Sequence, residues 1–221
     1  MDKQKKVRFK ICCISSVDEA NLAIKYGASA LGLVSEMPSG PGVISNELIK
    51  EIAEQTPPPI STFLLTSKTD AKDIIEQQKE LRTNAIQIVD ELKTGTYAEI
   101  KEALPGITIV QVVHVIDDAS VKYAVEVSNQ VDALLLDSGN PNLSTKVLGG
   151  TGKIHNWEIS KKIREGVSIP IFLAGGLNPV NAKSAIETVG PFALDLCSGV
   201  RTNGKLDESK LAAFVNSLES N

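Results

Sequence analysis

Short apolar runs alternate with amphipathic stretches eight times along the 221-residue chain. Runs such as 133–136 are almost continuously hydrophobic, which is typical of parallel strands that are covered by helices. We predict strands over residues 7–14, 29–34, 60–65, 84–89, 107–115, 131–136, 169–174 and 192–197. Helices are predicted between and after them, over residues 17–26, 45–55, 70–82, 95–103, 117–129, 156–165, 179–188 and 207–218.

The predicted helices begin and end at residues that suit these positions. Ser16, Ser45 and Asp117 precede helices as caps, Gly27 ends the first helix, and Pro105-Gly106 ends the fourth. Eight strand–helix units leave no room for a second domain in a chain of this length. The expected fold is therefore a single (β/α)8 TIM barrel, an α/β domain over residues 1–221.

An open, doubly wound α/β sheet is the alternative fold. It would be expected to carry a G-x-G-x-x-G motif after the first strand, where this chain has Cys12-Cys-Ile-Ser15.

Composition narrows the classes of partner. A net charge of −4 offers no electrostatic footprint for nucleic acid or an anionic membrane, and the apolar runs are too short to span a bilayer. Three cysteines, two of them adjacent and none in a C-x-x-C motif, predict free thiols and no zinc site. We expect a cytoplasmic protein without a signal peptide that binds a small molecule; the sequence predicts nothing about oligomeric state.

The last two strands end in glycine-bearing segments. These are Ala174-Gly-Gly-Leu177 and Cys197-Ser-Gly-Val200, about one strand–helix unit apart. In a barrel, the loops after strands 7 and 8 commonly hold a phosphate with backbone N–H groups. The alternative is that the glycines only turn the chain from strand to helix.

Two strand ends carry candidate catalytic groups. Alternation along the first strand places Lys10 and Cys12 on one face, with Cys13 on the other, and Cys12 would point into the barrel mouth. Cys12 is either a reactive thiol or a small buried hydrophobe. Asp137 follows an apolar run and lies far before the next helix, so proton transfer is favoured over capping. Asp195, inside the last strand, is expected to be a structural carboxylate.

The remaining polar features carry weaker predictions. Gly149-Gly-Thr-Gly-Lys153 lacks full nucleotide-loop spacing and suits a lid over the barrel mouth. His114 could face a ligand, but neither it nor His155 has a cluster of ligands for a metal, and Trp157 is expected to pack a helix.

Taken together, these strand ends resemble those of the phosphoribosylanthranilate isomerases of tryptophan biosynthesis. The resemblance runs in order from residue 7 to about 215. It rests on Lys10-Ile-Cys12, Leu134-Leu-Leu-Asp-Ser138, Gly149-Gly-Thr-Gly-Lys153 with Trp157, Ala174-Gly-Gly-Leu-Asn-Pro179 and Ser198-Gly-Val200.

The resemblance implies an Amadori rearrangement without metal or cofactor. Asp137 would be the general acid that opens the furanose, and Cys12 the general base that removes the C2′ proton, with Lys10 as a nearby positive charge. Backbone amides would hold the phosphate of the phosphosugar at Gly175, Gly176, Ser198 and Gly199. Lys10, Gln87 and Gly150 are further substrate-binding candidates.

The chain also departs from the family pattern. Cys13 replaces a glycine, and Gly42 stands where the family has an arginine that binds the anthranilate carboxylate. Gln-Leu-His-Gly becomes Gln87-Ile-Val-Asp90, and Ser-Gly-Val-Glu becomes Ser198-Gly-Val-Arg201. Arg201 is therefore a candidate to supply the missing cation.

Three functions remain open at this point. The chain is an isomerase of this type, a divergent paralogue acting on another phosphosugar, or a non-catalytic barrel that binds a phosphorylated ligand. Retention of Cys12 and Asp137 argues against the third. Indole-glycerol-phosphate synthase is disfavoured because, beyond Lys10, the strand ends lack its catalytic lysines.

Overall fold

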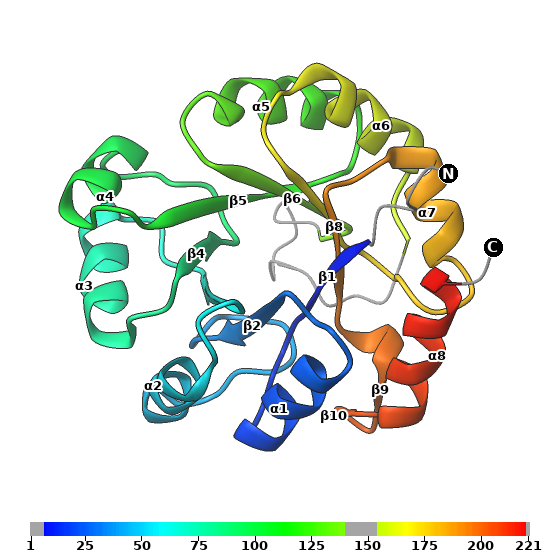
Figure 1. The fold of residues 1–221 in the computed structure, drawn as a ribbon. Coiled ribbons are helices and arrows are strands. Elements are labelled where there is room, and N and C mark those ends of the chain that lie inside the picture. The colour runs from blue at the N-terminus through cyan, green and yellow to red at the C-terminus, as the bar shows by residue number, and fades with distance from the viewer. Residues whose placement is uncertain (1–6, 140–153, 220–221) are drawn as a thin grey trace.

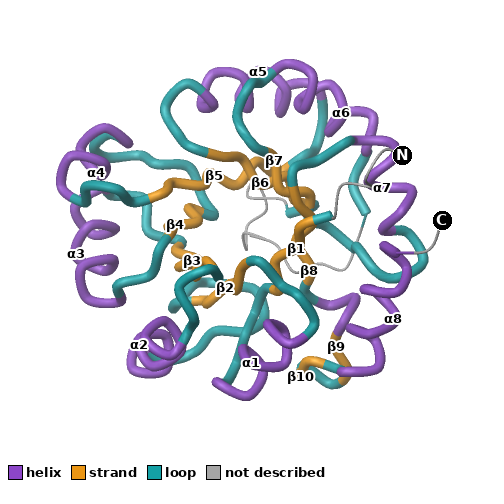
Figure 2. The backbone as a smooth tube through the Cα atoms, viewed as in Figure 1, coloured by secondary structure: helices purple, strands orange, loops and turns teal. Residues whose placement is uncertain are grey.

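Within the residues that the computed structural model describes, eight parallel strands form a closed barrel surrounded by eight helices (Figures 1 and 2), so the predicted (β/α)8 TIM barrel is confirmed. The structure describes residues 7–139 and 154–219. Each strand pairs with its neighbours in sequence, and the first pairs with the last. The strands are β1 (Arg8–Ile11), β2 (Ala30–Val34), β3 (Ser61–Thr66), β4 (Ala85–Ile88), β5 (Thr108–His114), β6 (Ala133–Asp137), β7 (Ile171–Leu173) and β8 (Ala193–Leu196).

The helices pack around the outside of the barrel (Figure 1). Ser16, Ser45 and Asp117 cap α1, α2 and α5 through side-chain oxygens that accept backbone N–H groups, as predicted. Among the described residues, no helix has the length and apolar character needed to cross a bilayer. The helices are α1 (Val17–Lys25), α2 (Asn46–Gln55), α3 (Ala71–Leu81), α4 (Tyr97–Ala103), α5 (Asp118–Ser128), α6 (Trp157–Gly166), α7 (Ala182–Val189) and α8 (Glu208–Glu219).

Alternation along the strands divides the core into two layers. Phe9 and Ile11 of β1 pack between strands and helices, whereas Lys10 points into the barrel. The interior is filled by apolar side chains, among them Phe63 and Phe172, whose rings meet edge to face with centroids 5.5 Å apart. A solid interior leaves the carboxyl ends of the strands as the place for a ligand.

Three local features differ from the predicted boundaries. β1 ends at Ile11 because Cys13 adopts a left-handed backbone conformation, with φ of 62°. β7 begins only after Pro170, whose nitrogen carries no hydrogen for the ladder. A short 3-10 helix, η1 (Ser198–Val200), and a hairpin of β9 (Arg201–Thr202) and β10 (Lys205–Leu206) precede α8.

Candidate active site

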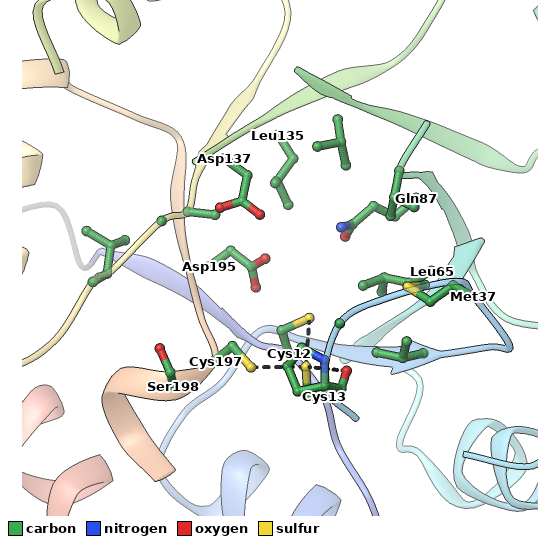
Figure 3. Close-up of a pocket in the computed structure, with 18 of the residues that line it drawn as sticks. Cys12, Cys13, Met37, Leu65, Gln87, Leu135, Asp137, Asp195, Cys197 and Ser198 are labelled. Carbon is green, nitrogen blue, oxygen red and sulfur yellow. Dashed lines mark hydrogen bonds between the residues drawn. The ribbon is translucent and has the colours of Figure 1, made fainter. Parts of the chain in front are cut away.

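A single pocket at the carboxyl ends of the strands gathers most of the predicted site residues (Figure 3). It receives side chains from strands β2 to β6 and from β8, and further residues from the segments that follow β1, β2, β4, β7 and β8. The residues that line it are Cys12, Cys13, Val34, Met37, Ser39, Gly40, Pro41, Leu65, Gln87, Val89, Val112, Leu135, Asp137, Ala174, Gly175, Gly176, Leu177, Asp195, Cys197 and Ser198.

Asp137 is the last residue of β6, and its carboxyl group faces the pocket (Figure 3). Its Oδ1 accepts a hydrogen bond of 2.7 Å from the backbone N–H of Ser138. Burial raises the pKa of Asp137 above its ordinary value, and this outweighs the hydrogen bonds from Ser138 and the charge of Lys10, which lower it. A carboxyl group with a raised pKa is suited to donate a proton.

Cys12 lies just beyond β1 and lines the same pocket. Its backbone N–H donates to the carbonyl of Leu196 over 2.7 Å, and its carbonyl accepts from the Arg201 Nη2 over 3.0 Å. The backbone on both sides of the thiol is therefore fixed by hydrogen bonds.

Cys12 belongs to a cluster of three thiols that sequence reasoning missed (Figure 3). The sulfur atoms of Cys13 and Cys197 lie 3.0 Å apart, and those of Cys12 and Cys13 lie 3.9 Å apart. Strand alternation predicts Cys13 on the face opposite Cys12, but its left-handed backbone turns the side chain into the same pocket. Hydrogen bonds to Cys12 and Cys197, together with burial, raise the pKa of Cys13, so its thiol stays protonated. The hydrogen bond with Cys13 lowers the pKa of Cys197, and the charge of Arg201 acts in the same direction.

Lys10 lies inside the barrel below the pocket and is fully buried. Its Nζ contacts Asp195 Oδ1 at 2.7 Å, as expected for a structural carboxylate in the last strand. Burial alone would lower the pKa of Lys10, but the charge of the Asp195 carboxylate and the hydrogen bond to it raise the pKa above the ordinary value. Lys10 is absent from the residues lining the pocket, so it acts here as a buried charge.

The glycine-bearing loops after β7 and β8 meet at one end of the pocket. Gly175 and Gly176 both have positive φ, 82° and 64°, and line the pocket with Ser198. Gly199 packs against the backbone of Leu177, where a Cβ atom would overlap the carbonyl group. Glycines without side chains let the backbone of these two loops come close to a ligand, which is what a phosphate site after β7 and β8 would require.

Of the further substrate-binding candidates, Gln87 lies in the pocket and Gly150 cannot be placed. Gln87 lines the pocket, and its buried Oε1 has no hydrogen-bond partner among the described residues. Gly150, with the predicted lid at 149–153, lies outside the described residues.

Arg201 does not reach the pocket. Its Nη1 donates to Glu19 over 3.0 Å, and its Nη2 donates to the Cys12 and Cys13 carbonyls over 3.0 and 2.6 Å. These bonds commit the guanidinium to holding the backbone after β1, so the hypothesis that Arg201 replaces the missing cation is wrong.

The two histidines lie beside the pocket rather than in its lining. The His114 Nε2 contacts the Val89 carbonyl at 2.9 Å. The His155 Nε2 contacts the Ser160 Oγ at 2.7 Å, and burial lowers the pKa of His155 to about 4. Trp157 packs against the layer between strands and helices, as predicted. Among the described residues, no three His, Cys, Asp or Glu side chains gather in a way that could hold a metal ion.

Comparison with known proteins agrees with this geometry. The family model described as N-(5'phosphoribosyl)anthranilate (PRA) isomerase matches residues 9–217. An N-(5'-phosphoribosyl)anthranilate isomerase 2 from Methanosarcina mazei is 34% identical over 212 residues, which cover 95% of this chain and 93% of the relative. A phosphoribosylanthranilate isomerase from Methanothrix thermoacetophila is 34% identical over 216 residues, covering 96% and 98% of the two chains.

Solved structures give the same result. The crystal structure of phosphoribosyl anthranilate isomerase from Thermotoga maritima superposes with a TM-score of 0.80 at 28% identity, covering 96% of this chain and 98% of the other. A further isomerase, in complex with reduced 1-(o-carboxyphenylamino)-1-deoxyribulose 5-phosphate, gives a TM-score of 0.77 at 25% identity with the same coverage. The chain therefore belongs to the phosphoribosylanthranilate isomerase family of tryptophan biosynthesis, and it is an isomerase.

Proposed function

We propose that this enzyme converts phosphoribosylanthranilate into the open-chain carboxyphenylamino-deoxyribulose phosphate, with Asp137 as acid and Cys12 as base. The observation that carries the proposal is the shared pocket. Asp137 at the end of β6 and Cys12 just after β1 are far apart in the sequence, and both line the same cavity as Gly175, Gly176 and Ser198. A phosphate bound by these loops would place the ribose over the acid and the base.

Asp137 begins the reaction in its protonated form. It donates a proton to the ring oxygen of the furanose while the bond between C1′ and that oxygen breaks, and the nitrogen lone pair forms the C1′=N bond. Its raised pKa supports this role, because a larger fraction of the carboxyl group is protonated at a given pH.

Cys12 acts in the second step as a thiolate. It removes the proton from C2′, the C–H electron pair forms the C1′=C2′ bond, and the π pair of C1′=N returns to the nitrogen, which gives an enolamine. Tautomerisation to the 2-ketone then transfers the O2′ proton to C1′. The Lys10 ammonium, buried below the pocket, supplies positive charge that supports a thiolate at Cys12. The overall conversion is an isomerisation and needs no external oxidant or reductant.

The phosphate end is proposed from the loops after β7 and β8. Gly175, Gly176, Ser198 and Gly199 would hold the phosphate with backbone N–H groups and the Ser198 hydroxyl. The relative that binds a reduced deoxyribulose 5-phosphate supports a phosphorylated open-chain sugar as the ligand.

A turnover assay tests the proposal. We expect the purified protein to convert phosphoribosylanthranilate formed in situ, and Cys12→Ala and Asp137→Asn each to lower kcat by about 100-fold or more. Asp117→Asn is the matched control, because Asp117 is an exposed cap of α5 outside the pocket. Failure of the wild-type protein to turn over the substrate, or full activity of either site variant, would contradict the proposal.

A further inference from the structure

Cys13 keeps its side chain in the site at a conformational cost. Its φ of 62° lies in the left-handed region, which disfavours residues with a Cβ atom. The thiol contacts the Cys197 sulfur at 3.0 Å and the Pro41 carbonyl at 3.5 Å. Cys13 therefore connects the end of β1 to the loop between β2 and α2. A strained residue with specific partners on two other loops points to a role in shaping the pocket.

Gly42, in the loop after β2, lies directly against Cys13. Its φ is 82°, and a Cβ atom added there would come within 2.9 Å of both Cα and Sγ of Cys13. A separation below 3.0 Å between such atoms is a steric clash. As long as Cys13 is present, residue 42 can carry no side chain without moving the loop or the end of β1. The two residues are therefore structurally coupled.

This loop closes the end of the pocket opposite the proposed phosphate site (Figure 3). The side chains at that end are mostly apolar, and the Gln87 amide adds a neutral polar group; the apolar residues are Val34, Met37, Pro41, Leu65, Val89 and Val112. Among the described residues that line the whole pocket there is no lysine or arginine, and the ionisable carboxyl groups are those of Asp137 and Asp195.

The absence of a positive charge in the described lining affects which aglycone the pocket can bind, where the aglycone is the group attached to C1′ of the ribose. Met37 and Leu65 lie across the pocket from Ser198 (Figure 3), so an aglycone would extend toward them when the phosphate is held at the loops after β7 and β8. A carboxylate there would lose water without gaining a charged partner from the described lining, which is unfavourable. An uncharged aromatic ring would bury apolar surface without that cost.

We propose that Cys13 determines the specificity of this enzyme by imposing glycine at position 42, so that the aglycone end recognises an apolar aryl group and makes no use of its carboxylate. The inference rests on the proposed isomerisation and names its substrate class, namely phosphoribosyl-arylamines with or without a carboxylate.

The first test compares two substrates formed in situ from ribose 5-phosphate, one with anthranilate and one with aniline. The wild-type enzyme is expected to isomerise both, with kcat/KM values within about threefold of each other. An enzyme that bound the carboxylate with a charged partner would favour anthranilate by about tenfold or more. Turnover of anthranilate alone, or a preference above tenfold, overturns the inference and leaves the proposed function intact. Turnover of neither substrate overturns the proposed function itself, and the inference with it.

Variants at both positions test the role of Cys13. In Cys13→Gly/Gly42→Arg, the contacts with Cβ and Sγ of residue 13 are gone, and the loop has to shift only far enough to relieve the remaining contact with its Cα. The arginine adds a charge, so the preference should shift toward anthranilate by about tenfold or more. Cys13→Gly/Gly42→Met is the matched control, with a long neutral side chain and no expected shift. If the arginine variant folds and its ratio of kcat/KM for the anthranilate substrate to that for the aniline substrate equals the ratio of the methionine variant, the proposed role of Cys13 in specificity is wrong.

A stability measurement tests the coupling without any substrate. Gly106→Ala reports the cost of a Cβ atom at positive φ alone, because Gly106 has φ of 84° and no atom within 4 Å of the added Cβ. We expect Gly42→Ala to lower Tm by several degrees more than Gly106→Ala does. Cys13→Gly should reduce that excess, because the contacts with Cβ and Sγ disappear while the contact with Cα at 2.9 Å stays. If Gly42→Ala lowers Tm equally in the wild type and in Cys13→Gly, the effects of residues 13 and 42 on stability are independent.

Discussion

The Lys10 ammonium and the Asp195 carboxylate meet at 2.7 Å inside the barrel, directly across the pairing of β1 with β8. Lys10 has no exposed surface, and its Nζ also lies 5.5 Å from the centre of the Phe63 ring. A buried ion pair of this kind adds little net stability compared with two apolar residues, but loss of one partner leaves an isolated charge. Burial of either charge is therefore tolerated only while the other residue is present to pair with it.

We expect Lys10→Met to lower the free energy of unfolding by about 3–5 kcal/mol, because Asp195 is left buried without its partner. Lys10→Met/Asp195→Leu should recover most of that loss, since no charge remains to be buried. Urea unfolding of the wild type, both single variants and the double variant measures the coupling. A double variant whose loss equals the sum of the single losses would show that the pair is not coupled.

The raised pKa of Asp137 predicts a pH dependence of the reaction. The general acid must be protonated, so kcat/KM should fall as pH rises through the pKa of Asp137, and burial places this limb above the ordinary range of an aspartate. A pH–rate profile of the wild-type enzyme measures it, with melting curves at each pH to separate inactivation from unfolding. A limb at the ordinary aspartate pKa, or the same limb in the residual activity of Asp137→Asn, would argue against this role.

The barrel could be predicted from the sequence because its signals are local. Near-continuous apolar runs mark the strands, and caps such as Ser16 and Asp117 mark helix starts. The strand-end rule then placed Cys12 and Asp137 in one pocket. The expected role of Asp195 followed from its position inside an apolar strand, and Lys10 is the partner that such burial demands.

The thiol cluster and the position of Arg201 could not be predicted in the same way. From the sequence, side chains are predicted to alternate between the two faces of the first strand as far as Cys13. The left-handed backbone of Cys13 ends this alternation and turns its side chain into the pocket. Arg201 is committed to Glu19 in α1 and to carbonyls after β1. These partners are distant in the sequence, and nothing in the spacing of charged residues identifies them.

The loop after β7 predicts a response to inorganic phosphate. Phosphate that binds the folded protein should raise Tm, and each 1 kcal/mol of binding free energy corresponds to about 2–4 °C for a chain of this size. Gly175→Ala should weaken the response, because its Cβ atom would lie 2.8 Å from the His155 Nδ1 and 3.3 Å from Ser138. Gly204→Ala is the control, since Gly204 has a similar φ of 78° and open space around the added atom. Equal phosphate responses in the two variants would exclude a phosphate site at Gly175.

His155 predicts how stability depends on pH. Its Nε2 contacts the Ser160 Oγ at 2.7 Å, its Nδ1 is buried without a partner among the described residues, and burial lowers its pKa from 6.5 to about 4. Between these values the unfolded chain binds a proton at His155 that the folded protein does not, so stability must fall as pH drops from 6.5 toward 4. The full loss from this residue is about 3 kcal/mol. In His155→Gln the titrating group is gone, while the amide can still form a hydrogen bond to Ser160. Urea unfolding at several pH values should give a shallower fall for this variant than for the wild type, and parallel curves would show that His155 is not the group responsible.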